Sequence, residues 1–359
     1  MFYWDYTSCA TRTHASGLQR VSKRLLHELQ LLYPGRVTPV IWNARRQTLE
    51  KWPNSLLGRD KVQLKSGNIL VTPSVFAESE REGWNQNVLQ TNARCYAVYH
   101  DAIPLRHPEF TWPHSVERHP YYMQELSRYK AVFAVSDASA KELLGYWKWQ
   151  QLASHPPVVS FPLGADYAGQ PRQSPTGWGA RAAELVCVGI LEPRKNQTRL
   201  LEAMEILHQR KRRVVAHLVG RANPHFGKPI VKYIESLQAK GVGIVWHSPA
   251  TDNQIHALYK RVRCAVFCSL AEGNGLPVME ALWEGVPVVS SSIPATDKLG
   301  PNHGVTKVNP HDAQELASAI ESILFDEDRY QEMTKGIMRT QLPSWSVSAA
   351  ALWKLTTAS

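Results

Sequence analysis

Two glutamates, Glu272 and Glu280, stand eight positions apart within residues 269–288. A short apolar run ends where this segment begins, so we expect Glu272 in a loop and Glu280 about one turn into a following helix. Carboxylates at these places can accept hydrogen bonds from the hydroxyls of a sugar or a ribose. For Glu280 alone, a simpler interpretation is a favourable charge near the positive end of a helix.

The glycines between these glutamates favour a tight turn against a ligand. Gly273 and Gly275 allow the backbone to approach another molecule closely, and Pro277 suits the first turn of a helix. The backbone N–H groups that would then point at phosphate or sugar oxygens belong to Asn274, Gly275 and Leu276. A dinucleotide fingerprint would need its third glycine at Val278, which argues against a nicotinamide or flavin site.

Two adjacent cations, Arg194 and Lys195, follow a second apolar run. Gly189 precedes them and allows close approach of the backbone, and a helix is predicted to begin near Asn196. Arginine binds phosphate oxygens as a fork and lysine binds them as a point charge, so the pair could clamp a diphosphate. Taken alone, such a pair is more commonly part of a solvated surface.

The sequence offers little evidence for a metal site. The Asp-x-Asp pattern at 326–328 follows one helix-like segment and opens another, which is typical of the acidic first turn of a surface helix. The five cysteines include no C-x-x-C pair, and they predict core residues of a chain in a reducing compartment. We therefore expect no bound metal.

Short apolar runs alternate with helical patterns over the whole chain, which predicts parallel sheets with helices on both faces. The predicted strands span 68–72, 95–99, 131–135 and 157–161, and then 184–188, 214–219, 242–246, 264–268 and 286–290. The predicted helices span 17–32, 196–209, 229–240, 253–262 and 277–284. Ligands of open α/β sheets bind at the carboxyl ends of the strands, where both clusters of candidate residues fall.

The length of 359 residues favours two domains. We expect an N-terminal domain over 1–164 and a C-terminal domain over 184–344. The Gly- and Pro-rich segment 165–183 is the linker candidate, and the helix-like tail 345–359 could cross back onto the first domain. Two doubly wound domains would then face each other across a cleft.

The net charge of +10 suggests acidic partners such as phosphorylated small molecules, nucleic acid or an anionic membrane surface. The basic residues are scattered and no nucleic-acid-binding signature accompanies them, so nucleic acid is not an expected partner. The sequence carries no apolar run of transmembrane length and no secretion signal at its start. We expect a cytoplasmic protein that could touch the inner face of a membrane without spanning it.

Together, the two clusters resemble the signature of family 4 glycosyltransferases, which have the GT-B fold of two Rossmann-like domains. That signature joins a Gly-x₄-Arg-Lys-Asn segment, here 189–196, to a Glu-x₇-Glu segment, here 272–280. Asn274 stands where the family usually has phenylalanine. The resemblance covers nearly all of 184–345.

The first half of the chain resembles the family less densely. His100 and Asp101 are similar to the family's His-Asp segment after a strand, and 161–166 is similar to its entry to the linker. Residues 16–21 resemble a loop of many polysaccharide-assembly members, with the single glycine Gly17 where other members have two.

The resemblance implies a role for each matched position. Arg194 and Lys195 would hold the diphosphate of a nucleotide-sugar donor and stabilise charge on the leaving nucleotide. Glu272 would contact the donor sugar, Glu280 would bind the ribose hydroxyls, and His100 would lie near the transferring sugar. The resemblance also implies that the backbone at Gly17 and Gly189 lies close to the donor. The backbone N–H groups of Asn274, Gly275 and Leu276 would contact the donor directly.

As a whole, the resemblance implies a retaining glycosyltransferase that moves a hexose from GDP-mannose or a UDP-hexose to a glycan or lipid-linked acceptor in cell-surface polysaccharide biosynthesis. It implies no metal or other cofactor, because in this fold cations and helix ends stabilise the leaving group. Two alternatives stay open: a nucleotide-sugar hydrolase or epimerase of the same fold, and a catalytically inactive protein that binds sugar nucleotides.

Overall fold

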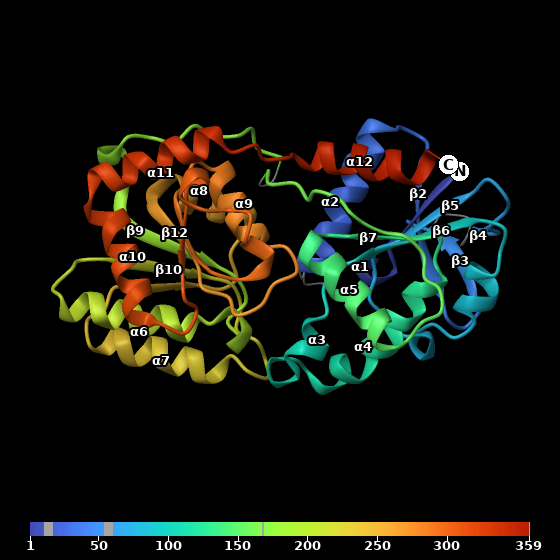
Figure 1. The fold of residues 1–359 in the computed structure, drawn as a ribbon, viewed down its shortest axis with the longest axis horizontal. Helices are drawn as coiled ribbons and strands as arrows, with labels where there is room; N and C mark the ends of the chain where they lie inside the picture. The colour runs from blue at the N-terminus through green and yellow to red at the C-terminus, as the bar shows by residue number, and fades with distance from the viewer. Residues whose placement is uncertain (11–16, 54–59, 167–168, 359) are drawn as a thin grey trace. The chain divides into compact units, whose positions relative to one another are not determined.

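The computed structural model describes residues 1–10, 17–53, 60–166 and 169–358. The chain forms two compact units. Unit 1 comprises Met1–Gly164 together with Pro343–Ser359, and unit 2 comprises Ala165–Leu342 (Figure 1). Each unit is an α/β structure built on one sheet whose strands are mainly parallel.

The sheet of unit 1 has eight strands in the order β4-β3-β2-β1-β5-β6-β7-β8. Their bounds are β1 (Phe2–Asp5), β2 (Val37–Asn43), β3 (Thr48–Lys51), β4 (Lys61–Val62), β5 (Ile69–Thr72), β6 (Arg94–Tyr99), β7 (Ala131–Ala134) and β8 (Val158–Ser160). The sequence analysis predicts β5 to β8 and misses β1 to β4, of which β3 and β4 form an unpredicted antiparallel edge. The signal is weak there because β2 contains Pro39 and because β3 and β4 are short and partly charged.

The α-helices of unit 1 include five from residues 1–164 and one from the end of the chain. Their bounds are α1 (Thr7–Ala10), α2 (Gly17–Leu32), α3 (Ile103–Arg106), α4 (Pro113–Glu125), α5 (Asp137–Trp149) and α12 (Trp345–Thr357). The helix predicted over 17–32 is confirmed, and it buries an apolar face that includes Val21, Leu25 and Leu29.

The C-terminal helix α12 packs on unit 1. The ring of Trp353 lies 5.1 Å from that of Phe2 and 3.9 Å from that of Tyr33, both as stacked pairs. The hydroxyl of Tyr96 donates a hydrogen bond of 3.3 Å to the backbone carbonyl of Thr356. Aromatic stacking and a buried hydrogen bond thus join the last helix to β1, to the end of α2 and to β6.

The sheet of unit 2 has six parallel strands in the order β11-β10-β9-β12-β13-β14. Their bounds are β9 (Ala182–Val188), β10 (Val215–Val219), β11 (Ile244–His247), β12 (Val262–Phe267), β13 (Val288–Ser291) and β14 (Val305–Val308). The helices are α6 (Gln197–Gln209), α7 (Lys228–Ala239), α8 (Asp252–Arg261), α9 (Leu276–Trp283), α10 (Ala313–Phe325) and α11 (Glu327–Arg339). One apolar cluster packs α6, α7 and α10 on one face of the sheet, and another packs α8 and α9 on the other.

The segment predicted as a linker is hydrogen-bonded into unit 2 over residues 169–183. The guanidinium of Arg172 donates to the carbonyl of Ile337 over 2.6 Å, and the N–H of Gln173 donates to the carbonyl of Trp283 over 2.9 Å. Arg181 donates to three further carbonyls of the same unit. The glycines and prolines of the segment indicate little regular secondary structure. The segment is nevertheless attached to unit 2 by hydrogen bonds and is not a flexible linker between the units.

None of the helices in the described part of the chain is long and apolar enough to cross a bilayer. The five cysteines are buried and unpaired by disulfides. Burial raises the pKa of the Cys95 and Cys264 thiols to about 12, so at neutral pH both are protonated core side chains.

Candidate functional site

The candidate site of unit 2 lies where two neighbouring strands end. β9 ends at Val188 and β12 ends at Phe267, and the two strands are paired in parallel in the middle of the sheet. The loops that follow them must therefore meet at the same edge. The backbone N–H of Leu270 donates to the carbonyl of Arg194 over 2.8 Å, which joins the two loops directly.

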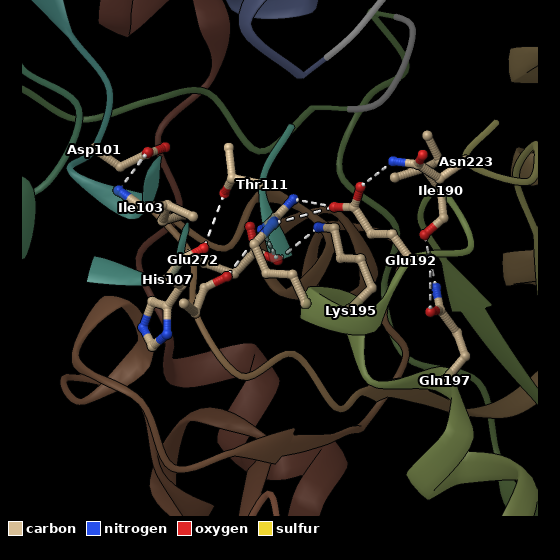
Figure 2. A network of polar contacts seen from close by, with 12 residues as sticks. Asp101, Ile103, His107, Thr111, Ile190, Glu192, Lys195, Gln197, Asn223 and Glu272 are labelled. Atoms are coloured by element: carbon tan, nitrogen blue, oxygen red, sulfur yellow. Dashed lines mark hydrogen bonds and ion pairs between the residues drawn. The ribbon is translucent and has the colours of Figure 1, made fainter. Parts of the chain in front are cut away.

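The two predicted cations and the first predicted glutamate form one ion-paired cluster. The ammonium of Lys195 donates to Oε1 of Glu272 over 2.6 Å, and Nη1 of Arg194 lies 3.0 Å from the same oxygen. Figure 2 shows Lys195 and Glu272 pointing toward each other from the two loops. All three side chains are between 11% and 18% exposed, so the charges are mostly shielded from water.

A second carboxylate, which the sequence analysis does not single out, fixes the guanidinium from the other side. Oε1 of Glu192 accepts from Nη2 and Nε of Arg194 over 2.8 and 3.1 Å. Oε2 of Glu192 accepts from the side-chain amide of Asn223, which follows β10, over 3.1 Å (Figure 2). Such a fork between arginine and a carboxylate sets the orientation of the guanidinium. The available signal was the position of Glu192, two residues before Arg194 in the same loop.

The cations hold Glu272 in its charged form. Burial raises the pKa of this carboxyl, but the nearby charges of Arg194 and Lys195 and the hydrogen bond from Lys195 outweigh it and lower the pKa to about 2. The glutamate is therefore a carboxylate at every physiological pH.

The lowered pKa of Glu272 predicts how the stability of the protein changes in acid. The folded pKa lies below the unfolded value of about 4.5, so the carboxylate contributes stability above pH 4.5 and loses it as the pH falls toward 2. We expect the wild type to exceed Glu272→Gln in unfolding free energy by about 3 kcal/mol at pH 7, and the difference to shrink below pH 4.5. Denaturant unfolding of both proteins at about pH 7, 4 and 3 measures it. A difference that stays constant with pH would contradict the ion pairing.

Backbone geometry at the turn after the cations depends on Asn196. This residue has a left-handed φ of 55°, and its side-chain amide donates to the carbonyls of Cys268 and Pro310 over 3.1 and 2.8 Å. Asparagine tolerates this conformation better than most residues. Asn196 thus holds the two loops and the start of α6 in place.

Gly189 and a second glycine, which the sequence analysis does not name, let the backbones of two strand ends meet. A Cβ on Gly220 would lie 2.2 Å from the carbonyl oxygen of Gly189, a distance that no side chain can occupy. Gly189 itself lies beside the stem of Lys195, because a Cβ there would be 3.5 Å from its carbons. Gly220 is therefore required for the close approach of the two strand ends, whereas a Cβ on Gly189 would make only an ordinary contact with Lys195.

The turn before α9 has the predicted form. Gly275 precedes the helix with a φ of +87°, and α9 begins at Leu276 after Asn274 and Gly275 in the loop. Glu280 lies in the second turn of α9 and is buried at 1% exposure. The N terminus of the helix, with its partial positive charge, thus begins at the same sheet edge as the cation cluster.

Replacing Gly275 tests how much this turn matters. An alanine there would have to adopt a left-handed φ, and its Cβ would lie 3.1 Å from Cγ2 of Thr296. We expect Gly275→Ala to lower the unfolding free energy by about 1–2 kcal/mol and to weaken anion binding at α9 about tenfold, because the backbone N–H groups shift. Thermal unfolding and titration with a nucleoside diphosphate measure the two effects. Gly241→Ala, also at positive φ but with open space around it, is the control. Unchanged anion binding in Gly275→Ala would contradict the role of the turn.

The remaining predicted residues, His100 and Gly17, belong to unit 1. His100 follows β6, is 6% exposed, and its Nε2 lies 3.2 Å from the carbonyl of Pro73. Burial lowers its pKa to about 4, so the imidazole is neutral at pH 7 and can exchange hydrogen bonds with a hydroxyl but carries no charge. Gly17 is the first residue of α2, and the preceding residues 11–16 of the predicted loop lie outside the described residues.

The acidic pattern at 326–328 caps a helix, as predicted. Asp326 precedes α11, and its carboxylate accepts a hydrogen bond of 3.0 Å from the N–H of Arg329. Glu327 and Asp328 follow as acidic residues of the first turn, where negative charge is favourable. Within the part of the chain that the structure describes, no group of three or more His, Cys, Asp or Glu side chains could hold a metal ion.

Comparison with known proteins identifies relatives of this site. Residues 174–339 match the family described as glycosyl transferases group 1. The chain is 26% identical over 323 residues to the serotype-specific mannosyltransferase WbdA of Escherichia coli, a match that covers 83% of this chain but only 38% of WbdA. It is 24% identical over 266 residues to the O-antigen chain mannosyltransferase B of Escherichia coli, covering 70% and 67% of the two chains. The chain therefore spans well under half the length of WbdA.

Two solved structures match the whole chain. Sucrose-phosphate synthase from Thermosynechococcus elongatus has a TM-score of 0.69 at 18% identity, and the match covers 99% of this chain and 97% of that one. Anabaena HepE, in complex with UDP and glucose, has a TM-score of 0.69 at 14% identity and coverage of 100% and 99%. These likenesses confirm the predicted fold class, GT-B, and the family match confirms the predicted resemblance to glycosyltransferases.

Proposed function

We propose that this chain, whose residues 174–339 match the group 1 glycosyl transferases, is a retaining glycosyltransferase that moves a hexose from a nucleoside diphosphate sugar to a glycan or lipid-linked acceptor. The observation that carries the proposal is the cluster of Arg194, Lys195 and Glu272 at one sheet edge of unit 2. Two fixed cations beside a carboxylate suit a substrate that has a diphosphate next to a hydroxylated ring.

The chemistry follows from the charges. When the bond between the sugar and the diphosphate breaks, negative charge grows on the leaving phosphate, and Arg194 and Lys195 stabilise it without reorganising. Glu272 accepts hydrogen bonds from the sugar hydroxyls and orients the ring. Glu280 binds the ribose. The oxygen of the acceptor hydroxyl bonds to the sugar carbon that the diphosphate leaves, and its proton passes to the leaving phosphate, so no side chain acts as a covalent nucleophile in this scheme.

Mannose is the sugar we propose, with GDP-mannose as the donor and UDP-hexoses as rivals. The similarity to two proteins whose names describe mannosyltransferases supports mannose, and the name of one of them supports an O-antigen-like polysaccharide as the product. We further propose that the protein is cytoplasmic and works at the inner face of a membrane, where its surplus of 41 basic over 31 acidic residues favours anionic lipids.

Turnover is expected to need no metal ion, since the cations of the chain itself meet the leaving diphosphate. We expect an excess of EDTA to leave the rate of sugar transfer within about twofold of the untreated rate. Transfer measured after dialysis against EDTA, with Mg²⁺ or Mn²⁺ added back to half of the sample, makes the comparison. Loss of transfer that only the added metal restores would contradict the mechanism.

The experiment that tests the function measures release of nucleoside diphosphate from GDP-mannose and UDP-hexoses, with and without a mannan oligosaccharide or lipid-linked glycan. Release that rises on addition of acceptor, together with a lengthened glycan in the mass spectrum, supports the proposal. Release that acceptor does not increase would favour a hydrolase or epimerase, and binding without release would favour an inactive sugar-nucleotide-binding protein.

A further inference from the structure

Three polar side chains run in a row across three neighbouring strands of unit 2, on the face that α8 covers. Nε2 of His217 in β10 lies 2.9 Å from Oε2 of Glu184 in β9. Nδ1 of the same imidazole lies 3.0 Å from Nε2 of His247 in β11. The side chain of His217 is 4% exposed, which is unusual for a histidine in the middle of a strand.

The row begins at a carboxylate that can only accept hydrogen bonds. The guanidinium of Arg261, at the end of α8, donates to Oε1 of Glu184 over 2.6 Å. Although burial raises the pKa of Glu184, the hydrogen bonds from Arg261 and His217 outweigh it and lower the pKa overall. Glu184 is therefore charged at neutral pH, and its Oε2 must accept a hydrogen bond from Nε2–H of His217.

The tautomers of both histidines follow from this start. In the form of His217 that carries a proton on Nε2 alone, Nδ1 has a lone pair and accepts from Nε2–H of His247. A neutral His247 that carries its proton on Nε2 has a lone pair on Nδ1. Nδ1 has no hydrogen-bond partner among the residues that the structure describes, and the side chain is half-buried. The row thus ends in a hydrogen-bond acceptor that the protein itself leaves unused.

This acceptor stands at the same sheet edge as the cation cluster. His247 is the last residue of β11 and is in register with Val219 of β10, which is in register with Val188, the last residue of β9. Neighbouring strands lie about 4.8 Å apart, so the end of β11 is about 10 Å from the end of β9. Lys195 lies in the loop that follows β9. The N–H of Gly220 donates to the carbonyl of His247 over 3.0 Å and holds the edge together.

We infer that His247 accepts a hydrogen bond from a ring N–H of the nucleobase of the donor, and that Glu184 and His217 are positioning residues that hold it in the accepting tautomer. The inference rests on the proposed function, since it assigns a contact to the nucleotide of that same donor. If the diphosphate of the donor binds to Arg194 and Lys195, the base extends along the carboxyl ends of the strands toward β11. The hydrogen-bonding edges of uracil and guanine each carry a ring N–H suited to an acceptor.

The test separates the base from the diphosphate. Affinities for UDP, GDP and inorganic pyrophosphate are measured by calorimetry for the wild type, His247→Leu and His217→Phe. The control is His256→Leu, which removes another histidine–glutamate pair, His256 with Glu284 at 2.9 Å, from the same face of the unit. Circular dichroism and thermal unfolding establish that each variant is folded.

We expect His247→Leu to bind the preferred nucleoside diphosphate about tenfold more weakly and pyrophosphate as tightly as the wild type, because one hydrogen bond to the base is lost. His217→Phe should weaken the same nucleotide about threefold, since His247 can then adopt either tautomer. His256→Leu should change neither affinity. If His217→Phe does not fold, the affinities of His247→Leu alone test the inference, because His247 is only half-buried.

Equal affinities of His247→Leu and the wild type for the nucleotide would overturn the inference, and so would an equal loss for nucleotide and pyrophosphate. Failure of the proposed function looks different and is seen in the wild type: it would then bind neither UDP, GDP nor pyrophosphate, or it would bind a nucleoside diphosphate without transferring sugar from the matching donor.

Discussion

Glu272→Ala is expected to transfer sugar about a thousandfold more slowly than the wild type while binding a nucleoside diphosphate as tightly or more tightly. In the proposed function the carboxylate positions the sugar, so its loss would remove a contact that the reacting ring needs. The same carboxylate pairs with both cations at 2.6 and 3.0 Å, so its loss removes a negative group that competes with the phosphates of the ligand for these cations. Rate and affinity should therefore move in different directions.

The measurement combines steady-state transfer with calorimetric titration of the free nucleoside diphosphate. Glu205→Ala is a matched control, because Glu205 forms an ion pair of 2.7 Å with Lys240 on the surface of the same unit. It should leave both quantities unchanged. If Glu272→Ala kept its transfer rate, Glu272 would be only a structural partner of the cations.

Arg194→Ala is expected to lose affinity for the diphosphate by about 10- to 100-fold, because a charge-assisted hydrogen bond contributes about 1.5–3 kcal/mol. Transfer should fall about a thousandfold, since the same guanidinium also stabilises the leaving group. The unit should remain folded, because Glu272 keeps Lys195 as a partner and Glu192 keeps Asn223.

Arg194→Lys distinguishes charge from geometry. Lysine retains the positive charge but cannot reproduce the fork to Glu192, so we expect partial binding and little transfer. Arg212→Ala, which removes an exposed arginine paired with Glu321 at 2.6 Å, serves as the control. Full activity in Arg194→Ala would show that another group holds the diphosphate.

Much of unit 2 is predictable from its sequence because strands such as β12 and β13 are buried on both faces. Segments such as Cys264–Phe267 read as continuous apolar runs, and the order of strands and helices then implies a parallel sheet. In unit 1, β2 with Pro39 and the short strands β3 and β4 break that pattern, so their antiparallel edge is visible only in the structure.

The charged residues of the site are predictable from their spacing, but what fixes them is not. Arg194, Lys195 and Glu272 follow apolar runs, and parallel strands bring such positions to one edge. Glu192 lies two residues before Arg194, which is a weak signal for their contact, but the contact between Asn223 and Glu192 depends on side-chain geometry that no spacing encodes. The row ending at His247 is equally hidden, because a histidine within a strand gives no sign of which neighbours its two nitrogens meet.

The most direct test of the central claim, that unit 2 binds a nucleoside diphosphate through Arg194 and Lys195, is a thermal-shift titration of the wild type and Arg194→Ala with UDP, GDP, ADP, CDP and dTDP, with and without EDTA. A ligand at about 100 times its dissociation constant adds about 2.7 kcal/mol of stability. The account predicts that one diphosphate stabilises the wild type equally with and without EDTA and stabilises Arg194→Ala much less. Stabilisation by none of the five, or equal stabilisation of both proteins, would contradict it.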